Sequence, residues 1–485
     1  MAISYRSYEP QQEMLLPASL QDWLPKGHLA YFISDTVDAL DLKAFYARYA
    51  GGGARNQPFH PAMMVKVLVY GYATGVFSSR KIERRLHEDL AFRMLGAGNF
   101  PKHRTIRDFR ALHLKELSDL FVQVVKLARE MGLVKLGTVA IDGTKLKANA
   151  SRHKAMSYER MQQAEAELNA QIDALLERAK TTDAAEADEP ELDIPAEIER
   201  REVRLKAIAD ARQRLEQRQL DADIQRGRSE DDDRKPCDED GSLKGGSYKR
   251  EFGVPEPKAQ ENFTDPASRI MKRAGGGFDP SYNAQTAIDD TAHIIVAAEV
   301  GNNAADVGQL VLMLKAVKDN TGQAPAQALA DAGYRSEKNF EEVAGSPTEL
   351  VVALGREGKR CAEIDAQKNP HTAAMSAKLQ TEEGKAAYRR RKWLAEPPNG
   401  WIKSVLGFRQ FSLRGLHRVQ AEFKLVCVAL NLRQMGAMRA VRRSKDERNR
   451  AQNSCPRALT DDQQRLQIPY GRFEEEIGAN RRKLD

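Results

Sequence analysis

Two short apolar segments, far apart in the chain, each end in an aspartate that is closely followed by glycine. Residues 136–143 contain Asp142, residues 326–333 contain Asp331, and the positions before each aspartate are mostly apolar. Short apolar runs bounded by turn residues are typical of buried strands. The segments around them carry apolar residues at helical spacing, so we expect an α/β fold in which helices cover the faces of a sheet.

A carboxylate just past a buried strand is held by the sheet and yet exposed at its edge. This position suits a hard divalent cation such as Mg²⁺, which prefers oxygen ligands and keeps several of its own waters. Carboxylates from several elements can hold two metal ions about 3.5–4 Å apart, and such a pair cleaves phosphodiesters. A single strand–Asp–Gly motif is more often an ordinary turn aspartate, so the motif alone leaves that alternative open.

A third acid, Glu396, lies in a basic segment near the C-terminus. Lys403 follows it by seven residues, so two helical turns would bring both side chains to one face. Pro397 and Pro398 fit only the first turn of a helix, so we expect the helix to start near Glu396. Arg391 and Lys403 would bring positive charge to phosphates there. The alternative is an ordinary surface segment with salt bridges.

Residues 1–137 have mostly helical patterns. One helix is expected to start at Pro61, another after Ser78 and Ser79, and a third at a capping Thr105. Short helices at this spacing resemble a helix-turn-helix arrangement, and the alternative is a plain helical bundle with solvated basic faces. The basic side chains that could contact phosphates are Arg80, Lys81, Arg84, Arg104, Arg107 and Arg110.

The rest of the chain alternates between charged helices and short strands. Apolar spacing predicts two long helices within residues 155–227, with the form of a helical hairpin or short coiled coil. The segments expected to form strands are 282–289, 293–300 and 349–354, the first two as an antiparallel hairpin. Residues 183–195 and 228–262 suggest a linker and a mobile loop, and 416–435 a helix.

Positive charge is concentrated near the C-terminus. The chain of 485 residues carries a formal charge of +7, and residues 385–450 hold 17 Lys and Arg against 4 Asp and Glu. The remaining residues hold 59 basic and 65 acidic side chains. A local basic patch indicates a polyanionic partner better than a global average does.

Several protein classes are disfavoured by what the sequence lacks. The four cysteines are scattered without CxxC spacing, which argues against a zinc site or a disulfide framework. The sequence has no run of 18 apolar residues and no apolar signal core at its start. We therefore expect a cytoplasmic protein with no membrane partner.

Taken together, these motifs resemble the DDE transposases of bacterial insertion sequences, over about residues 5–435. The strongest matching segments include Ile-Asp-Gly-Thr-Lys at 141–145, Asp-Ala-Gly-Tyr at 331–334 and Phe-Ser-Leu-Arg-Gly-Leu at 411–416. Others are 61–64, 70–72, 78–83, 105–110, 265–272 and 282–285.

The resemblance implies a ribonuclease-H-like catalytic domain with a mixed sheet, formed by residues 138–154 and 263–435. A charged helical insertion with a mobile loop, residues 155–262, would interrupt it. An all-α domain, residues 1–137, would precede it and bind DNA, and residues 436–485 would form a loose basic tail.

The resemblance also implies that Asp142, Asp331 and Glu396 form the acidic triad and bind Mg²⁺, with Mn²⁺ as an alternative. Tyr388, Arg391 and Lys403 would contact DNA beside it, and Arg80, Lys81 and Arg107 in the helical domain. The reaction would be hydrolysis at the element ends, followed by attack of the 3′ ends on target DNA.

The implied partners are double-stranded DNA, both terminal inverted repeats and target, and a second copy of the chain, at the nucleoid. Alternatives are a related metal-dependent nuclease without strand transfer, or a catalytically inactive DNA-binding remnant.

The sequence departs from the family pattern near Glu396. Asn399 stands where an aromatic residue is usual, and Pro398 where an apolar one is usual. Glu422 is another acid in a C-terminal helix and ranks below Glu396 as a metal ligand. Asp306 could approach the site, although capping the next helix is the simpler role. Trp401 could stack on a displaced base, although packing is the simpler role.

Overall fold

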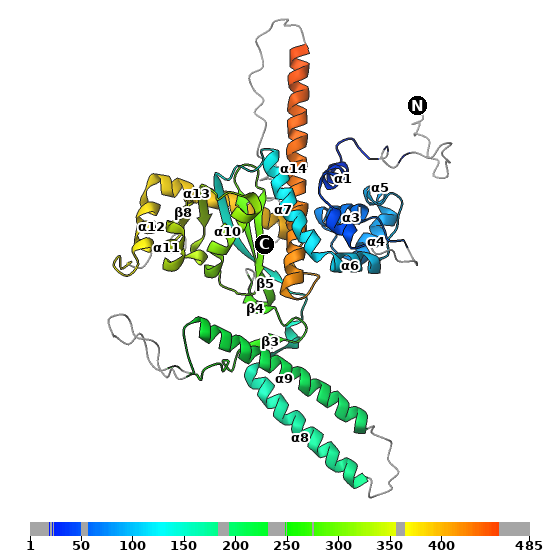
Figure 1. Ribbon diagram of the computed structural model, residues 1–485, viewed down its shortest axis with the longest axis vertical. Coiled ribbons are helices and arrows are strands. Elements are labelled where there is room, and N and C mark those ends of the chain that lie inside the picture. Colours follow the sequence, from blue (N-terminus) through cyan, green and yellow to red (C-terminus); the bar gives the residue numbers. More distant parts are fainter. Residues whose placement is uncertain are drawn as a thin grey trace, which may run out of the picture. The chain divides into compact units, whose positions relative to one another are not determined.

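The computed structural model describes residues 24–49, 57–182, 194–230, 250–273, 276–355 and 364–454, together with Ser19, Asp22 and Tyr248 (Figure 1). The chain divides into two compact units, Met1–Gly436 and Ala437–Asp485. Most of the predicted linker (183–193 of 183–195), most of the predicted loop (231–247 and 249) and the end of the tail (455–485) lie outside the described residues. No helix in the described ranges is long and apolar enough to cross a membrane.

The N-terminal region is helical, as predicted. Its helices are α1 (Leu29–Ala39), α2 (Lys43–Ala47), α3 (Pro61–Ala73), α4 (Ser79–Glu88), α5 (Leu90–Leu95), α6 (His103–Leu112) and α7 (Leu114–Glu130). Pro61 occupies the first turn of α3, where its missing N–H costs nothing. The predicted cap Thr105 is wrong, because α6 already begins at His103. The Glu83 carboxylate of α4 instead accepts the His103 backbone N–H at 3.0 Å and ties the two helices together.

The centre of the described protein is a sheet of six strands, which is mixed as predicted and has β4 as an unpredicted strand. Its strands are β1 (Thr138–Lys147), β4 (Arg269–Lys272), β5 (Phe278–Asp289), β6 (Ile295–Gly301), β7 (Gln327–Ala330) and β8 (Glu349–Val352). The order is β4-β5-β1-β7-β8, with β6 also paired to β5. β1 runs antiparallel to β5 and parallel to β7, and β5 with β6 forms the predicted antiparallel hairpin.

Helices cover the sheet. α13 (Glu382–Gly400) packs across β1, β7 and β8, where Leu394 and Ala395 meet the buried Ala140 and Leu329. α10 (Leu310–Thr321) packs on β6 and α7. The remaining elements of this region are the short helical turns η3 (Val307–Gln309), η4 (Ala332–Tyr334) and η5 (Trp401–Val405), and the helices α11 (Glu337–Ala344), α12 (Pro370–Gln380) and α14 (Leu416–Ser454).

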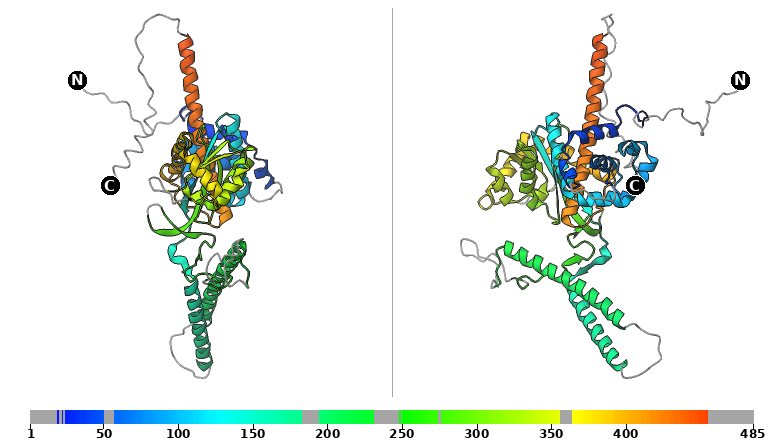
Figure 2. Two further views of the ribbon diagram at one scale, coloured as in Figure 1. Left: turned by 90° about the vertical axis from the view of Figure 1, so that its left-hand side faces the viewer. Right: turned by 45° about the vertical axis from the view of Figure 1, so that its right-hand side comes forward.

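The insertion forms the predicted helical hairpin. α8 (Tyr158–Thr182) and α9 (Ile194–Gln225) run side by side (Figure 2) and bury apolar residues such as Met161, Leu168 and Ile208 between them. β2 (Ala155–Ser157) pairs with β3 (Gln260–Asn262) and closes the base of the hairpin, after the turn η2 (Arg152–Lys154). The insertion therefore leaves and re-enters the core at one place.

Two predicted helix boundaries near the C-terminus are wrong. α13 starts at Glu382, not near Glu396, because Thr381 caps it by accepting the Gly384 N–H at 3.0 Å. Pro397 and Pro398 therefore lie inside the helix. Packing of its apolar face on the sheet offsets their lost hydrogen bonds.

The second error concerns the tail. α14 continues to Ser454, where a loose tail was expected from residue 436 onward. Residues 437–454 are rich in Arg and Ala, which are good helix formers, so helix propensity accounts for the continuation.

Candidate active site

Asp142 lies where the neighbours of β1 change. The strand was expected to end at this residue, but it continues to Lys147 because antiparallel pairing with β5 extends that far. Pairing with β7 on the other side reaches only Ala140. Asp142 therefore lies just beyond the point where pairing between β1 and β7 ends, in a part of β1 that remains paired with β5.

Asp331 comes directly after β7, as predicted. It caps the short turn η4, and its Oδ1 accepts the backbone N–H of Gly333 at 2.8 Å. Because β1 and β7 are parallel neighbours, Asp331 follows the end of β7 beside Asp142. The two aspartates that the sequence singled out thus meet at one edge of the sheet.

One arginine bridges the two aspartates. Nη2 of Arg391, on α13, lies 3.0 Å from Oδ1 of Asp142 and 3.5 Å from Oδ2 of Asp331. Nδ2 of Asn399, two turns further along α13, donates to Oδ2 of Asp142 at 3.0 Å. Asp142, Asp331 and Arg391 thus come together. Asn399 joins them, although in the sequence it stands out only as a departure from the family pattern.

Burial dominates the electrostatics of Asp142. Burial raises the pKa of this carboxyl to about 6, against the opposing effect of Arg391 and with a further rise from the charge of Asp331. Burial also lowers the pKa of Lys403, while the charge of Asp142 acts in the opposite direction. Lys403 therefore lies near enough to Asp142 for the two charges to interact.

Glu396 is not part of this arrangement. It lies on the exposed side of α13, together with Lys392 and Trp393, whereas Leu394 and Ala395 face the sheet. In the part of the chain that the structure describes, no three His, Cys, Asp or Glu side chains come together to hold a metal ion. The Asp142 and Asp331 carboxylates do fit a hard cation, because their oxygens converge on a single nitrogen of Arg391.

A second polar cluster lies on the opposite face of β1. The interpretation of Asp306 as a helix cap is wrong, because its side chain makes no capping bond to η3. Its Oδ1 instead accepts hydrogen bonds from Asn283 at 2.7 Å and Gln285 at 2.8 Å, and Lys145 lies 3.6 Å from its Oδ2. Asn283 and Gln285 are two apart on a predicted strand, so alternation was the signal that could have paired them.

Gly143 packs closely against the Asp306 cluster and cannot be replaced without disturbance. A Cβ at Gly143 would lie 2.7 Å from Oδ1 of Asp306 and 2.5 Å from Nε2 of Gln285. The glycine that follows Asp142 thus makes room for the Asp306 cluster behind the catalytic candidate.

The remaining predicted DNA contacts differ in accessibility. Tyr388 is half-buried and packs against the cluster of Ala140 and Leu329. The predicted basic residues that are exposed on α4 and α6 are Arg80, Lys81, Arg84, Arg104 and Arg107.

Arg110 and Glu422 do not have the roles considered for them. Arg110 is buried, so it is not available to phosphates: its Nη1 donates to the Tyr72 hydroxyl at 2.8 Å and lies 3.9 Å from Glu422. Glu422 is fixed in this interface between the N-terminal helices and α14, and it accepts the Ser412 and Leu413 backbone N–H groups at 2.9 and 3.0 Å. This acid is structural.

Trp401 is explained by packing. The guanidinium of Arg433 lies 5.3 Å from the centre of its ring, which is the distance of a cation–π contact. The indole therefore has an internal partner, in line with the simpler interpretation.

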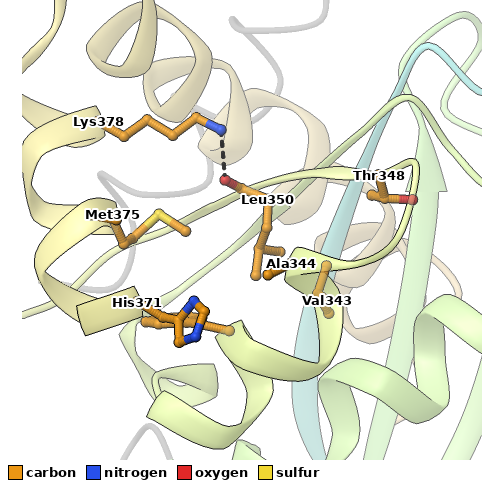
Figure 3. A pocket seen from close by; sticks show the side chains of 9 residues that line it. Val343, Ala344, Thr348, Leu350, His371, Met375 and Lys378 are labelled. Atoms are coloured by element: carbon orange, nitrogen blue, oxygen red, sulfur yellow. Dashed lines mark hydrogen bonds between the residues drawn. The ribbon is translucent and has the colours of Figure 1, made fainter. Parts of the chain in front are cut away.

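A pocket lies at the outer edge of the sheet, between α11, β8 and α12 (Figure 3). Its walls are mostly apolar, including Val343, Leu350 and Met375, and Lys378 donates to the Leu350 carbonyl at 3.0 Å. The carboxylates Asp142 and Asp331 do not line it, so it is not the site of the proposed chemistry.

The fold and the paired aspartates define a class of protein. A mixed sheet with an antiparallel β5–β6 hairpin, a parallel β7 and helices on its faces corresponds to a ribonuclease-H-like core, as expected.

Comparison with family models identifies the protein more closely. Residues 18–112 match the model described as "Transposase domain (DUF772)", and residues 251–432 match the "Transposase DDE domain". The chain belongs to the DDE transposases of insertion sequences. Neither curated proteins nor solved structures gave a match. The DDE match includes Asp331 and Glu396 but begins at residue 251, after the hairpin helices α8 and α9, so Asp142 lies outside it.

Proposed function

We propose that this transposase cuts DNA at the ends of its insertion sequence and joins the 3′ ends to target DNA, using divalent metal ions bound at Asp142 and Asp331. The observation that carries the proposal is the bridge formed by Arg391, whose single nitrogen lies within 3.5 Å of both carboxylates. Two carboxylates that are at least half-buried and share the Arg391 guanidinium are suited to bind Mg²⁺ or Mn²⁺ in its place.

The metal ions would activate the attacking water or 3′-hydroxyl and would stabilise the leaving oxygen of the phosphodiester. The sheet orients Asp142 and Asp331 toward the same point. Arg391 and Lys403 balance the charge of these carboxylates, and both can turn to phosphate oxygens when metal ions take over that role. Glu396, the third acid implied by the resemblance, remains the proposed partner of the two aspartates in the DNA-bound enzyme.

DNA binding is proposed for the exposed basic side chains of α4 and α6. Arg80, Lys81 and Arg107 are exposed on two helices that Glu83 and His103 hold together, and this link supports the proposal that they act as one basic surface. The basic segment from 385 onward would bind the DNA that enters the active site. Because two element ends must be joined together, we propose a homodimer as the working form on DNA.

The test uses the purified full-length protein and a duplex that carries the inverted repeat flanking its gene. We expect nicking at the repeat in Mg²⁺ or Mn²⁺, followed by joining to a second duplex. Asp142→Asn and Asp331→Asn should each reduce nicking by more than about 100-fold, because each removes charge from the metal site. Retained cleavage by either variant would reject the assignment.

Two outcomes support the alternatives. Cleavage without joining indicates a nuclease of the same class. Specific binding of the repeat without cleavage in either metal indicates an inactive DNA-binding remnant, an outcome that the exposed position of Glu396 makes worth testing. Glu396→Gln tests the third acid: unchanged nicking would remove it from the catalytic set.

A further inference from the structure

One buried amide in the site lacks a complete set of partners. Asn399 is only 7% exposed, and its Nδ2 donates to Oδ2 of Asp142 at 3.0 Å and more weakly to the Ala395 carbonyl at 3.4 Å. Nothing in the described parts of the chain donates a hydrogen bond to its Oδ1, although this oxygen is buried. Buried amide oxygens in folded proteins almost always have a partner, so the missing one calls for an explanation.

The free oxygen lies beside the carboxylate. Oδ1 and Nδ2 are bonded to the same carbon, and Nδ2 is in hydrogen-bond contact with Asp142. A half-turn of the amide about its last torsion exchanges the two atoms and directs Oδ1 toward Asp142. Without a cation, this rotation would place the Asn399 Oδ1 against the Asp142 carboxylate, so that two acceptors repel each other. With a cation between them, both oxygens could coordinate it.

The orientation of α13 favours Asn399 over its neighbours. Arg391, Ala395 and Asn399 follow one another at intervals of four residues, and the two polar side chains of this row both contact Asp142. Glu396 lies on the exposed side of the same helix. In the metal-free protein, the α13 side chain that both contacts Asp142 and carries an oxygen is therefore the Asn399 amide.

We propose that Asn399 is a metal ligand: its Oδ1 coordinates the divalent cation held by Asp142 and Asp331. This inference rests on the proposed function, because it assumes a cation at the two aspartates. Side-chain amide oxygens are ordinary ligands of hard cations, and the site then combines two charged ligands with one neutral one. Arg391 contributes the positive charge that the carboxylates need in the metal-free protein.

The test measures Mn²⁺ binding to the full-length protein without DNA, from the electron paramagnetic resonance signal of free Mn²⁺. Asn399→Leu keeps the approximate size and removes the oxygen, so it should weaken Mn²⁺ binding about 10-fold or more. Asn399→Asp replaces the neutral ligand by a charged one and should bind Mn²⁺ at least as tightly as the wild type. Glu383→Gln removes a carboxylate from the exposed first turn of the same helix and should leave binding unchanged.

Asp142→Asn separates this inference from the proposed function. If Asp142→Asn still binds Mn²⁺ as the wild type does, the proposed metal site itself is wrong. If Asp142→Asn abolishes binding while Asn399→Leu leaves it unchanged, only the role of Asn399 is overturned. Circular dichroism checks folding, and should Asn399→Leu not fold, weaker Mn²⁺ binding by a folded Asn399→Asp overturns the inference. Weakening by Glu396→Gln but not by Asn399→Leu would likewise assign the ligand of α13 to Glu396.

Discussion

Asp142→Asn should make the metal-free protein more stable, while it removes metal-dependent cleavage. Asp142 is 17% exposed at its side chain, and burial raises its pKa from 3.8 to about 6. A pKa raised by that amount means that ionising this carboxyl costs the folded state about 3 kcal/mol. Asparagine has the same shape without the charge, and Arg391 keeps Asp331 as a partner at 3.5 Å. We therefore expect a net gain of roughly 1–3 kcal/mol in the free energy of unfolding.

The pH dependence gives the sign of the effect. Below pH 3.8 the folded and unfolded chains both carry the proton on Asp142, and the carboxyl costs nothing. Between pH 3.8 and about 6 only the unfolded chain has lost the proton, so stability falls as the pH rises. Above pH 6 the loss is complete. The advantage of Asp142→Asn should therefore be full at pH 7.5 and nearly absent at pH 4.

Urea denaturation in EDTA at the two pH values measures the effect. Asp331→Asn is the matched control, because Asp331 also contacts Arg391 but its side chain is 40% exposed and loses less hydration on folding. The gain in the free energy of unfolding should therefore be smaller for Asp331→Asn than for Asp142→Asn. Mn²⁺ at about 100 times its dissociation constant should stabilise the wild type by about 2.7 kcal/mol and should not stabilise Asp142→Asn. An Asp142→Asn protein that is less stable than the wild type in EDTA at pH 7.5 would refute the reasoning.

Two further predictions concern the helical domain. Glu422→Gln should lower the free energy of unfolding by about 3–5 kcal/mol, because it leaves buried Arg110 without its counter-charge. The control Glu88→Gln removes an exposed ion pair with Arg84 and should lower the free energy of unfolding by less than about 1 kcal/mol. Thermal melts compare the two variants, and equal losses would mean that the Glu422–Arg110 pair contributes no more than an exposed ion pair. Replacing three exposed basic residues by alanine should reduce the salt dependence of DNA binding, the slope of log K against log salt, by about 2–3. These residues are Arg80, Lys81 and Arg107, and an unchanged slope in a filter-binding titration would exclude them as phosphate contacts.

The sequence was sufficient to predict five of the six strands of the described sheet and the two aspartates that come together at its edge. Short apolar runs ending in Asp-Gly identified β1 and β7, and parallel pairing then brings Asp142 and Asp331 together. The exact end of β1 could not be predicted, because strand length is set by the partner. β5 continues to pair up to Lys147, five residues beyond Asp142, and nothing local to Asp142 signals this.

The role of a residue whose contact partner lies far away in the sequence could not be predicted either. Arg110 has the same local surroundings as the exposed Arg107, since both follow Thr105 on one short helix. What separates them is Glu422, more than 300 positions away, which makes the buried side of α6 polar. A basic residue on an amphipathic helix therefore cannot be assigned to solvent or to a buried ion pair until the partner helix is known.

The helix that carries Glu396 shows why the third acid was the hardest residue to place. Two consecutive prolines normally indicate the first turn of a helix, and that rule set the expected start near Glu396. The Thr381 cap and the acidic residues Glu382 and Glu383 start α13 at Glu382, fourteen positions earlier. The rotation of a helix about its axis follows from its apolar face, and here Leu394 and Ala395 pack on the sheet. That rotation directs Asn399 toward Asp142 and leaves Glu396 exposed, so an amide ligand at Asp142 requires no movement of the helix.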